Sequence, residues 1–135
     1  MDLAKYRALF LEEAAEHLAE MSRALLALEK NTADTEAIDL AFRMAHSIKG
    51  MAASLDYHGP AELAHKLEDC LASERAAGRI DVRASELLFR ALEALERMVA
   101  SLRATGESPM PADPALIAEL SGQPAAAPEA PPKRA

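Results

Sequence analysis

Apolar residues recur at three- and four-residue steps through most of the chain, which is the spacing of one face of an α-helix. In residues 2–30 this apolar stripe consists of Leu3, Tyr6, Phe10, Ala14, His17, Met21, Leu25 and Leu28. Half of the residues are hydrophobic, but only 4% are aromatic. A chain with this periodicity and an Ala/Leu-rich, aromatic-poor composition is predicted to be all-α.

Short segments with capping residues, glycine or proline divide the pattern into helices. We expect the first helix at about Asp2–Lys30. The second is expected to begin at a Thr32 or Asp34 cap and to end at about Leu55. The third and fourth are expected at about Ala61–Ala77 and about Val82–Ala104. A fifth helix is expected to begin at Asp113-Pro114, end at Gly122 and cover one end of the bundle. Because the connections are short, the predicted fold is an antiparallel up-down four-helix bundle with a short fifth C-terminal helix.

The composition changes towards the C-terminus. Four of the eight prolines fall at positions 124, 128, 131 and 132, among several alanines. Such a segment cannot bury enough apolar surface to offset the entropy lost on ordering it. We therefore expect a helical domain at residues 1–121 and a flexible Pro/Ala-rich linker at residues 122–135, which leads to further domains outside this chain.

Charge and cysteine content exclude several classes of protein. The 15 basic and 22 acidic residues give a formal net charge of −7, which argues against nucleic acid or an anionic membrane as a partner. The N-terminus lacks the basic and apolar regions of a signal peptide, and no apolar run reaches the length of a membrane span. Cys70 is the only cysteine, so we expect no intramolecular disulfide and a buried apolar side chain. The expected location is the cytoplasm.

Two short motifs form a candidate site. His46, Lys49 and Gly50 stand at i, i+3 and i+4 of the second predicted helix and share one face. Helical geometry puts His46 at the solvent edge of the apolar stripe, and a glycine inside a helix costs about 1 kcal/mol relative to alanine, so Gly50 needs a packing or functional reason. In an antiparallel hairpin, residues equally far from the turn lie level. This register predicts that His46 lies beside Glu68 of the third helix. It likewise predicts that Lys49 lies beside His65.

The segment Ala45–Gly50 (AHSIKG), followed by His65–Glu68 (HKLE), resembles the histidine phosphotransfer domain at the N-terminus of CheA-type chemotaxis histidine kinases. The resemblance covers about the first 120 residues in the number and order of helices. One difference is Asp56, where such domains often carry glycine before the aromatic residue of the turn. Aspartate tolerates a left-handed backbone better than most residues, so we expect the turn to be retained.

The resemblance implies that His46 accepts a phosphoryl group from a kinase catalytic domain of the same or a partner CheA-type protein. His46 would then pass the group to an aspartate of a CheY-type response regulator receiver domain. For such a reaction Glu68 would accept a hydrogen bond from Nδ1–H of His46 and leave Nε2 as the nucleophile. Lys49 and His65 are expected to compensate the phosphoryl charge. The docking surface for the partners is expected at Arg43, Ser47, Gly50, Met51 and Ala53.

The sequence contains no phosphate-binding glycine loop and none of the nucleotide-binding boxes of a histidine kinase. We therefore expect no cofactor in this domain and no phosphorylation of the chain by itself, with ATP and Mg²⁺ belonging to the partner domains. The parent protein is expected to be a protein histidine kinase.

Two alternatives from other functional classes remain open. One is a metal site made by His46, His65 and Glu68, although the paired Glu-x-x-His motifs of di-metal bundles are absent. The other is a helical scaffold or adaptor without phosphotransfer.

His17 is interpreted as a histidine at the edge of the core. The glutamates of the first helix, Glu12, Glu13, Glu16 and Glu20, are interpreted as a solvent-exposed acidic face.

Overall fold

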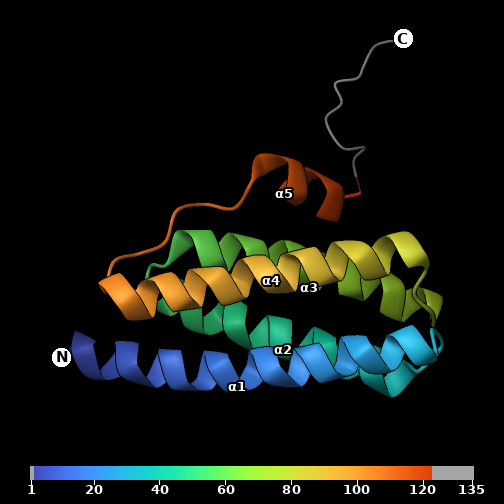
Figure 1. The fold of residues 1–135 in the computed structure, drawn as a ribbon, viewed down its shortest axis with the longest axis horizontal. Helices are drawn as coiled ribbons and strands as arrows, with labels where there is room; N and C mark the ends of the chain where they lie inside the picture. Colours follow the sequence, from blue (N-terminus) through green and yellow to red (C-terminus); the bar gives the residue numbers. More distant parts are fainter. Residues whose placement is uncertain (1, 123–135) are drawn as a thin grey trace, which may run out of the picture.

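The structure, a computed structural model, describes residues 2–122 and contains five helices in that range (Figure 1). They are α1 (Leu3–Lys30), α2 (Thr35–Ser54), α3 (His58–Ala77), α4 (Val82–Thr105) and α5 (Pro114–Leu120). The four long helices form an antiparallel bundle, and α5 lies outside it. The predicted all-α bundle with a short fifth helix is confirmed. The linker predicted at residues 122–135 lies, apart from Gly122, outside the described residues.

Four of the helices start at an aspartate cap. The side chains of Asp2, Asp34, Asp81 and Asp113 each accept a hydrogen bond from a first-turn backbone N–H at 2.7–3.3 Å. Helix α3 has no side-chain cap and begins at His58, earlier than the predicted Ala61. The predicted start rests on Pro60, which is interpreted as a residue that begins a helix. In the structure Pro60 lies within the first turn of α3, where no backbone N–H has a helical partner. A proline is therefore tolerated throughout that turn and does not mark its first residue alone.

The turn between α2 and α3 depends on Asp56, whose φ of 61° is the only positive value at a non-glycine residue between positions 2 and 122. In this conformation the N–H of Tyr57 donates to the carbonyl of Ala52 at 2.9 Å, which closes the end of α2. The Tyr57 ring packs against Phe10 of α1, with the two ring centroids 5.4 Å apart. The predicted left-handed Asp56 is confirmed, and the turn is fixed to the bundle.

We expect Asp56→Val to lower the free energy of unfolding by about 1–2 kcal/mol, because a β-branched side chain is strained at positive φ. Asp56→Asn should stay within about 0.5 kcal/mol of wild type, since asparagine tolerates the left-handed region. Urea unfolding followed by circular dichroism measures both variants. Equal stability of the two would contradict a role for backbone strain at this turn.

The core is a continuous apolar layer between the four long helices. Its largest fully buried helical side chains come from each of the four: Met21, Leu25, Leu28, Ile38, Ile48, Leu63, Leu67, Leu71, Leu88, Leu95 and Leu102. The first turns of α1 are not part of this layer, since Leu3 and Tyr6 are 68% and 45% exposed. Helix α2 ends at Ser54 beside them and does not cover them. Cys70, predicted to be buried, is half-buried against the core.

Helix α5 packs along the side of the bundle, so the prediction that it covers one end is wrong. Its Leu116 and Leu120 are buried, and it contacts α3 and α4 but not the other described helices. Glu119 of α5 lies between two arginines of α4, 3.3 Å from Arg90 and 3.6 Å from Arg83. The segment before α5 crosses the start of α3, where a Cβ on Gly59 would lie 2.8 Å from the Met110 carbonyl oxygen. This arrangement leaves the outer face of α2 free of α5.

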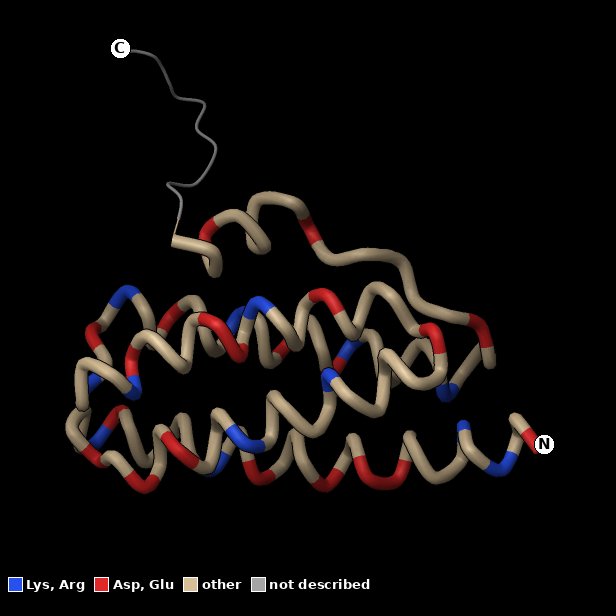
Figure 2. The backbone as a smooth tube through the Cα atoms, turned by 180° about the vertical axis from the view of Figure 1, so that it is seen from behind, with Lys and Arg blue, Asp and Glu red and all other residues tan. Residues whose placement is uncertain are grey.

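Positions occupied by Lys, Arg, Asp and Glu are spread along the helices of the bundle (Figure 2). The four glutamates of the predicted acidic face of α1 are exposed or half-buried, and Glu20 pairs with Arg23 at 2.5 Å. His17 is half-buried, as expected for a histidine at the edge of the core. None of the helices between residues 2 and 122 is long and apolar enough to cross a membrane.

Candidate functional site

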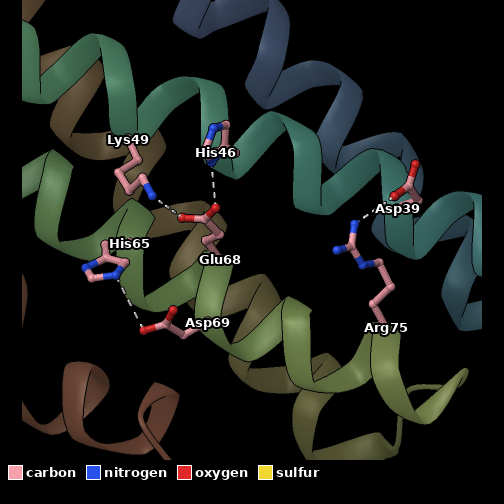
Figure 3. A network of polar contacts seen from close by, with 7 residues as sticks. All are labelled: Asp39, His46, Lys49, His65, Glu68, Asp69 and Arg75. Atoms are coloured by element: carbon pink, nitrogen blue, oxygen red, sulfur yellow. Dashed lines mark hydrogen bonds and ion pairs between the residues drawn. The ribbon is translucent and has the colours of Figure 1, made fainter.

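The candidate site lies where α2 and α3 pack against each other along the hairpin (Figure 3). His46 projects from α2 with 62% of its side chain exposed, while Glu68 projects from α3 and is the only buried charged residue between positions 2 and 122. Nδ1 of His46 lies 2.6 Å from Oε2 of Glu68. The hairpin register predicted this pair, because the two residues are equally far from the turn. The second ring nitrogen, Nε2, is not part of this contact.

Lys49 contacts the other oxygen of the same carboxylate. Its Nζ lies 2.6 Å from Oε1 of Glu68, whereas the register predicted a position beside His65 (Figure 3). Oε1 is buried, and the short ion pair with Lys49 compensates its charge. A buried carboxylate without compensation is costly. This cost explains why the flexible lysine turns to Glu68.

His65 does not join this group. Its side chain is 53% exposed, and its Nε2 lies 3.7 Å from Oδ2 of Asp69 on the same helix (Figure 3). Sequence reasoning missed Asp69, although the i, i+4 spacing of His65 and Asp69 is the signal that predicts such a pair. Among residues 2–122, no group of three or more His, Cys, Asp or Glu side chains is arranged to hold a metal ion. The structure therefore brings together His46, Lys49 and Glu68.

The environment of Glu68 keeps its carboxyl group ionised. Burial by itself raises the pKa of Glu68, but the ion pair with Lys49 and the hydrogen bond with His46 outweigh burial. The net effect is a pKa below the ordinary value of 4.5. At neutral pH the site therefore presents a carboxylate, which can only accept hydrogen bonds. With Glu68 as acceptor, Nδ1 of His46 must be the donor.

Because the pKa of Glu68 is lower in the folded state, this group stabilises the fold above its unfolded pKa, and the contribution is lost as pH falls through the folded pKa. We expect the stability difference between wild type and Glu68→Gln to be largest at neutral pH and to shrink below about pH 4.5. Urea unfolding between pH 7 and pH 3 measures this difference. Glu62→Gln, on an exposed position of α3, controls for the loss of one carboxylate. A difference that does not change with pH would contradict the assigned environment.

The residues of the predicted docking surface lie on the outer side of α2 around His46. Ser47 and Met51 are half-buried, while Arg43, Gly50 and Ala53 are exposed. A Cβ added at Gly50 would meet no atom within 4 Å, so packing inside the described part of the molecule does not require a glycine here.

The sequence did not indicate an apolar groove that continues from this surface to α1. The groove is lined by Leu3, Tyr6, Leu9, Phe10 and Glu13 of α1 and by Met51, Ser54 and Leu55 at the end of α2. Leu3 and Tyr6, which belong to the predicted apolar stripe, are 68% and 45% exposed. Periodicity assigns such residues to the core, because it does not reveal that the partner helix ends beside them.

Comparisons with known proteins agree with the resemblance. The family model described as Hpt domain matches residues 5–105. The chemotaxis protein CheA of Bacillus subtilis is 39% identical over 104 residues, which are 76% of this chain and 15% of that protein. The CheA phosphotransferase domain from Thermotoga maritima is 33% identical with a TM-score of 0.70, over 76% of this chain and 98% of that one. A solution structure of the histidine phosphotransfer domain of CheA is 29% identical with a TM-score of 0.79, over 87% of this chain and 90% of that one. The chain thus spans about 15% of the length of the curated relative.

Proposed function

Because the chain belongs to the Hpt domain family, we propose that it is the phosphoryl-carrying domain of a chemotaxis sensor kinase. His46 accepts a phosphoryl group from ATP bound to a kinase catalytic domain of the same or a partner CheA-type protein. It passes the group to an aspartate of a CheY-type receiver domain. The observation that carries the proposal is the exposed imidazole of His46, held at Nδ1 by the carboxylate of Glu68. ATP and Mg²⁺ belong to the partner domains.

The chemistry follows from the proton position on His46. With Nδ1–H donating to Glu68, the lone pair of Nε2 is free to attack the γ-phosphorus of ATP. The Nε2–P bond forms as the bond from that phosphorus to the bridging oxygen breaks, and ADP leaves. The ring becomes positively charged as the bond forms, and the carboxylate of Glu68 stabilises that charge. In the transfer to the receiver, an aspartate oxygen attacks the phosphorus. The O–P bond forms as the Nε2–P bond breaks, and His46 is released as a neutral imidazole.

Lys49 and His65 have supporting roles in this proposal. Lys49 maintains Glu68 in its ionised form through the 2.6 Å ion pair, so its removal slows transfer through Glu68. His65 belongs to the same α3 surface and is free to interact with a phosphoryl oxygen only when it leaves Asp69. We expect the substitution of either residue to slow transfer several-fold while leaving it measurable.

The partner domains dock on the outer face of α2. A receiver or kinase domain must bring its reacting atom to within about 3–3.5 Å of Nε2, so its body covers the neighbouring turns of the helix. These turns carry the exposed Arg43, Gly50 and Ala53 and the half-buried Ser47 and Met51. Small side chains at three of these five positions let a second backbone approach His46 closely.

The test is the intact mass of the domain after incubation with ATP, Mg²⁺ and a CheA-type catalytic domain. We expect one acid-labile phosphate on wild type, none on His46→Gln, and loss of the label when a CheY-type receiver domain is added. Circular dichroism of both proteins checks that they are folded. Absence of label on folded wild-type protein, with a kinase that labels its own Hpt domain, would favour a helical scaffold or adaptor instead.

A further inference from the structure

A phosphoryl group on His46 creates a charge imbalance that the site does not correct by itself. A phosphoryl group on a side chain carries about −1.5 to −2 charges at neutral pH, and the single positive charge of the His46 ring offsets only part of it. Lys49 is the cation of the site, and its ammonium lies 2.6 Å from the buried Oε1 of Glu68. Lys49 and Glu68 therefore balance each other before any phosphoryl group arrives. The incoming charge requires another cation.

Arg43 is placed to supply it. Arg43 and His46 are at i and i+3 of α2, and residues with this spacing are neighbours on a helix surface. Helical side chains lean towards the N-terminal end of their helix, so the His46 ring leans towards the turn that carries Arg43. The Arg43 side chain is 61% exposed, which leaves its guanidinium free to reorient.

The present partner of Arg43 is a shared one. Nε of Arg43 lies 3.0 Å from Oδ2 of Asp39. NH1 of Arg75 on α3 lies 3.0 Å from the other oxygen of Asp39, Oδ1 (Figure 3). The Arg75 guanidinium is also held over the Phe42 ring, 4.0 Å from its centroid. Asp39 therefore keeps a fixed cation when Arg43 leaves. Two arginines on one aspartate give this group a net charge of +1.

We propose that phosphorylation of His46 draws Arg43 away from Asp39 and onto the phosphoryl oxygens, while Arg75 stays on Asp39. The proposal rests on the proposed phosphorylation of His46. An exposed i, i+4 ion pair contributes little to stability, whereas a guanidinium binds a phosphate through two charge-assisted hydrogen bonds. The exchange gives Arg43 the stronger partner and leaves no carboxylate unpaired. It also makes the surface of α2 different in the two phosphorylation states, which a docking partner can recognise.

The experiment phosphorylates the full chain with phosphoramidate, a small donor that needs neither kinase nor receiver. Nε2 attacks the phosphorus, the bond from phosphorus to the amide nitrogen breaks, and ammonia leaves. The Nε–Hε resonance of Arg43 is then followed by NMR in wild type and in Asp39→Asn. We expect Asp39→Asn to shift this resonance in the unphosphorylated protein and to have no such effect after phosphorylation. An equal shift in both states would overturn the proposal.

Variants of Arg43 provide the second measurement, the ³¹P resonance of the phosphohistidine. We expect Arg43→Gln to shift this resonance and Arg43→Lys to restore it in part. Arg23→Gln is the matched control, because Arg23 forms an exposed ion pair with Glu20 on α1 and is 64% exposed. Identical ³¹P resonances in wild type and Arg43→Gln would contradict the contact. Because phosphoramidate replaces the kinase, failure of a kinase to label His46 is separate from either result.

Discussion

Replacing Gly50 by leucine will leave the domain as stable as wild type or more stable, and will slow phosphorylation of His46 by the kinase domain on the order of 100-fold, which corresponds to about 2.7 kcal/mol in the barrier. The first part follows from the empty space at Gly50, where an added Cβ meets no atom within 4 Å. Glycine inside a helix is less stable than alanine or leucine by about 0.8–1 kcal/mol.

The second part follows from the position of residue 50, one turn after His46 on α2. A helical side chain covers the surface over the turn that precedes it, so a leucine at 50 would extend over the His46 ring and the space that the phosphoryl group needs. Gly50→Ala adds only a methyl group, and we expect a much smaller loss of rate together with the gain in stability.

Two measurements on the same proteins distinguish a packing role of Gly50 from a role in partner access. They are urea unfolding and the rate of labelling by the kinase domain. Ala100→Leu is the control for an added exposed leucine, since Ala100 lies on the exposed side of α4. If Gly50→Leu unfolds more easily than wild type, the glycine serves packing. If it is labelled at the wild-type rate, partner approach does not explain the glycine.

Gly50 illustrates what the sequence predicts and what it leaves open. Helix propensity shows that a glycine in the middle of a helix needs a reason, but it does not distinguish close packing within the bundle from access for a partner. The answer depends on which atoms of other helices lie near residue 50. The structure answers it, because apart from the adjacent backbone of α2 no atom of the described residues lies within 4 Å of a Cβ built at Gly50.

The hairpin register was predictable because it depends on the regular geometry of two helices. His46 and Glu68 are equally far from a short turn, and both helices are continuous, so backbone geometry alone brings them level. The contact of Lys49 was not predictable in this way, since a flexible four-carbon side chain reaches more than one neighbour. It turns to Glu68 because that carboxylate is buried, and burial of a single residue is not visible in the sequence.

The start of α3 and the place of α5 mark two further limits. Pro60 indicates a helix beginning, but the first turn tolerates proline at several positions, so the true start at His58 was missed. The apolar residues of α5 show that it must pack against something. Periodicity does not encode whether that surface is the end or the side of the bundle, and the structure places α5 on the side, against α3 and α4.

Glu68→Gln will slow the phosphorylation of His46 on the order of 100-fold, within the range that correctly placed acid–base groups contribute. A carboxylate offers one oxygen to His46 at 2.6 Å and the other to Lys49 at 2.6 Å. A glutamine has a single oxygen, and the ammonium of Lys49 is the stronger competitor for it because it carries a full charge. The amide NH₂ then faces Nδ1 of His46. Nδ1 must become the acceptor, so the proton moves to Nε2 and blocks the attack.

Because Lys49 and His46 compete for the single oxygen of a glutamine at position 68, a second substitution is informative. Adding Lys49→Met to Glu68→Gln removes the competitor and lets the amide oxygen turn towards Nδ1 of His46. We therefore expect the double variant to be phosphorylated on the order of 10-fold faster than Glu68→Gln alone, although Lys49→Met alone slows the reaction. Imidazole ¹⁵N chemical shifts report the tautomer directly. They should show the proton on Nδ1 in wild type and in the double variant, and on Nε2 in Glu68→Gln.

Asp69→Asn is the matched control, because it removes a neighbouring carboxylate of α3 that contacts His65 and lies outside the His46 pair. We expect that variant to change the rate less than three-fold. If Glu68→Gln slows the reaction but retains the Nδ1–H tautomer, the charge of Glu68 matters more than the proton position. Since the two mechanisms predict different tautomers in Glu68→Gln, the imidazole ¹⁵N shifts of that variant decide whether Glu68 acts mainly by orienting the proton of His46 or by stabilising the positive ring.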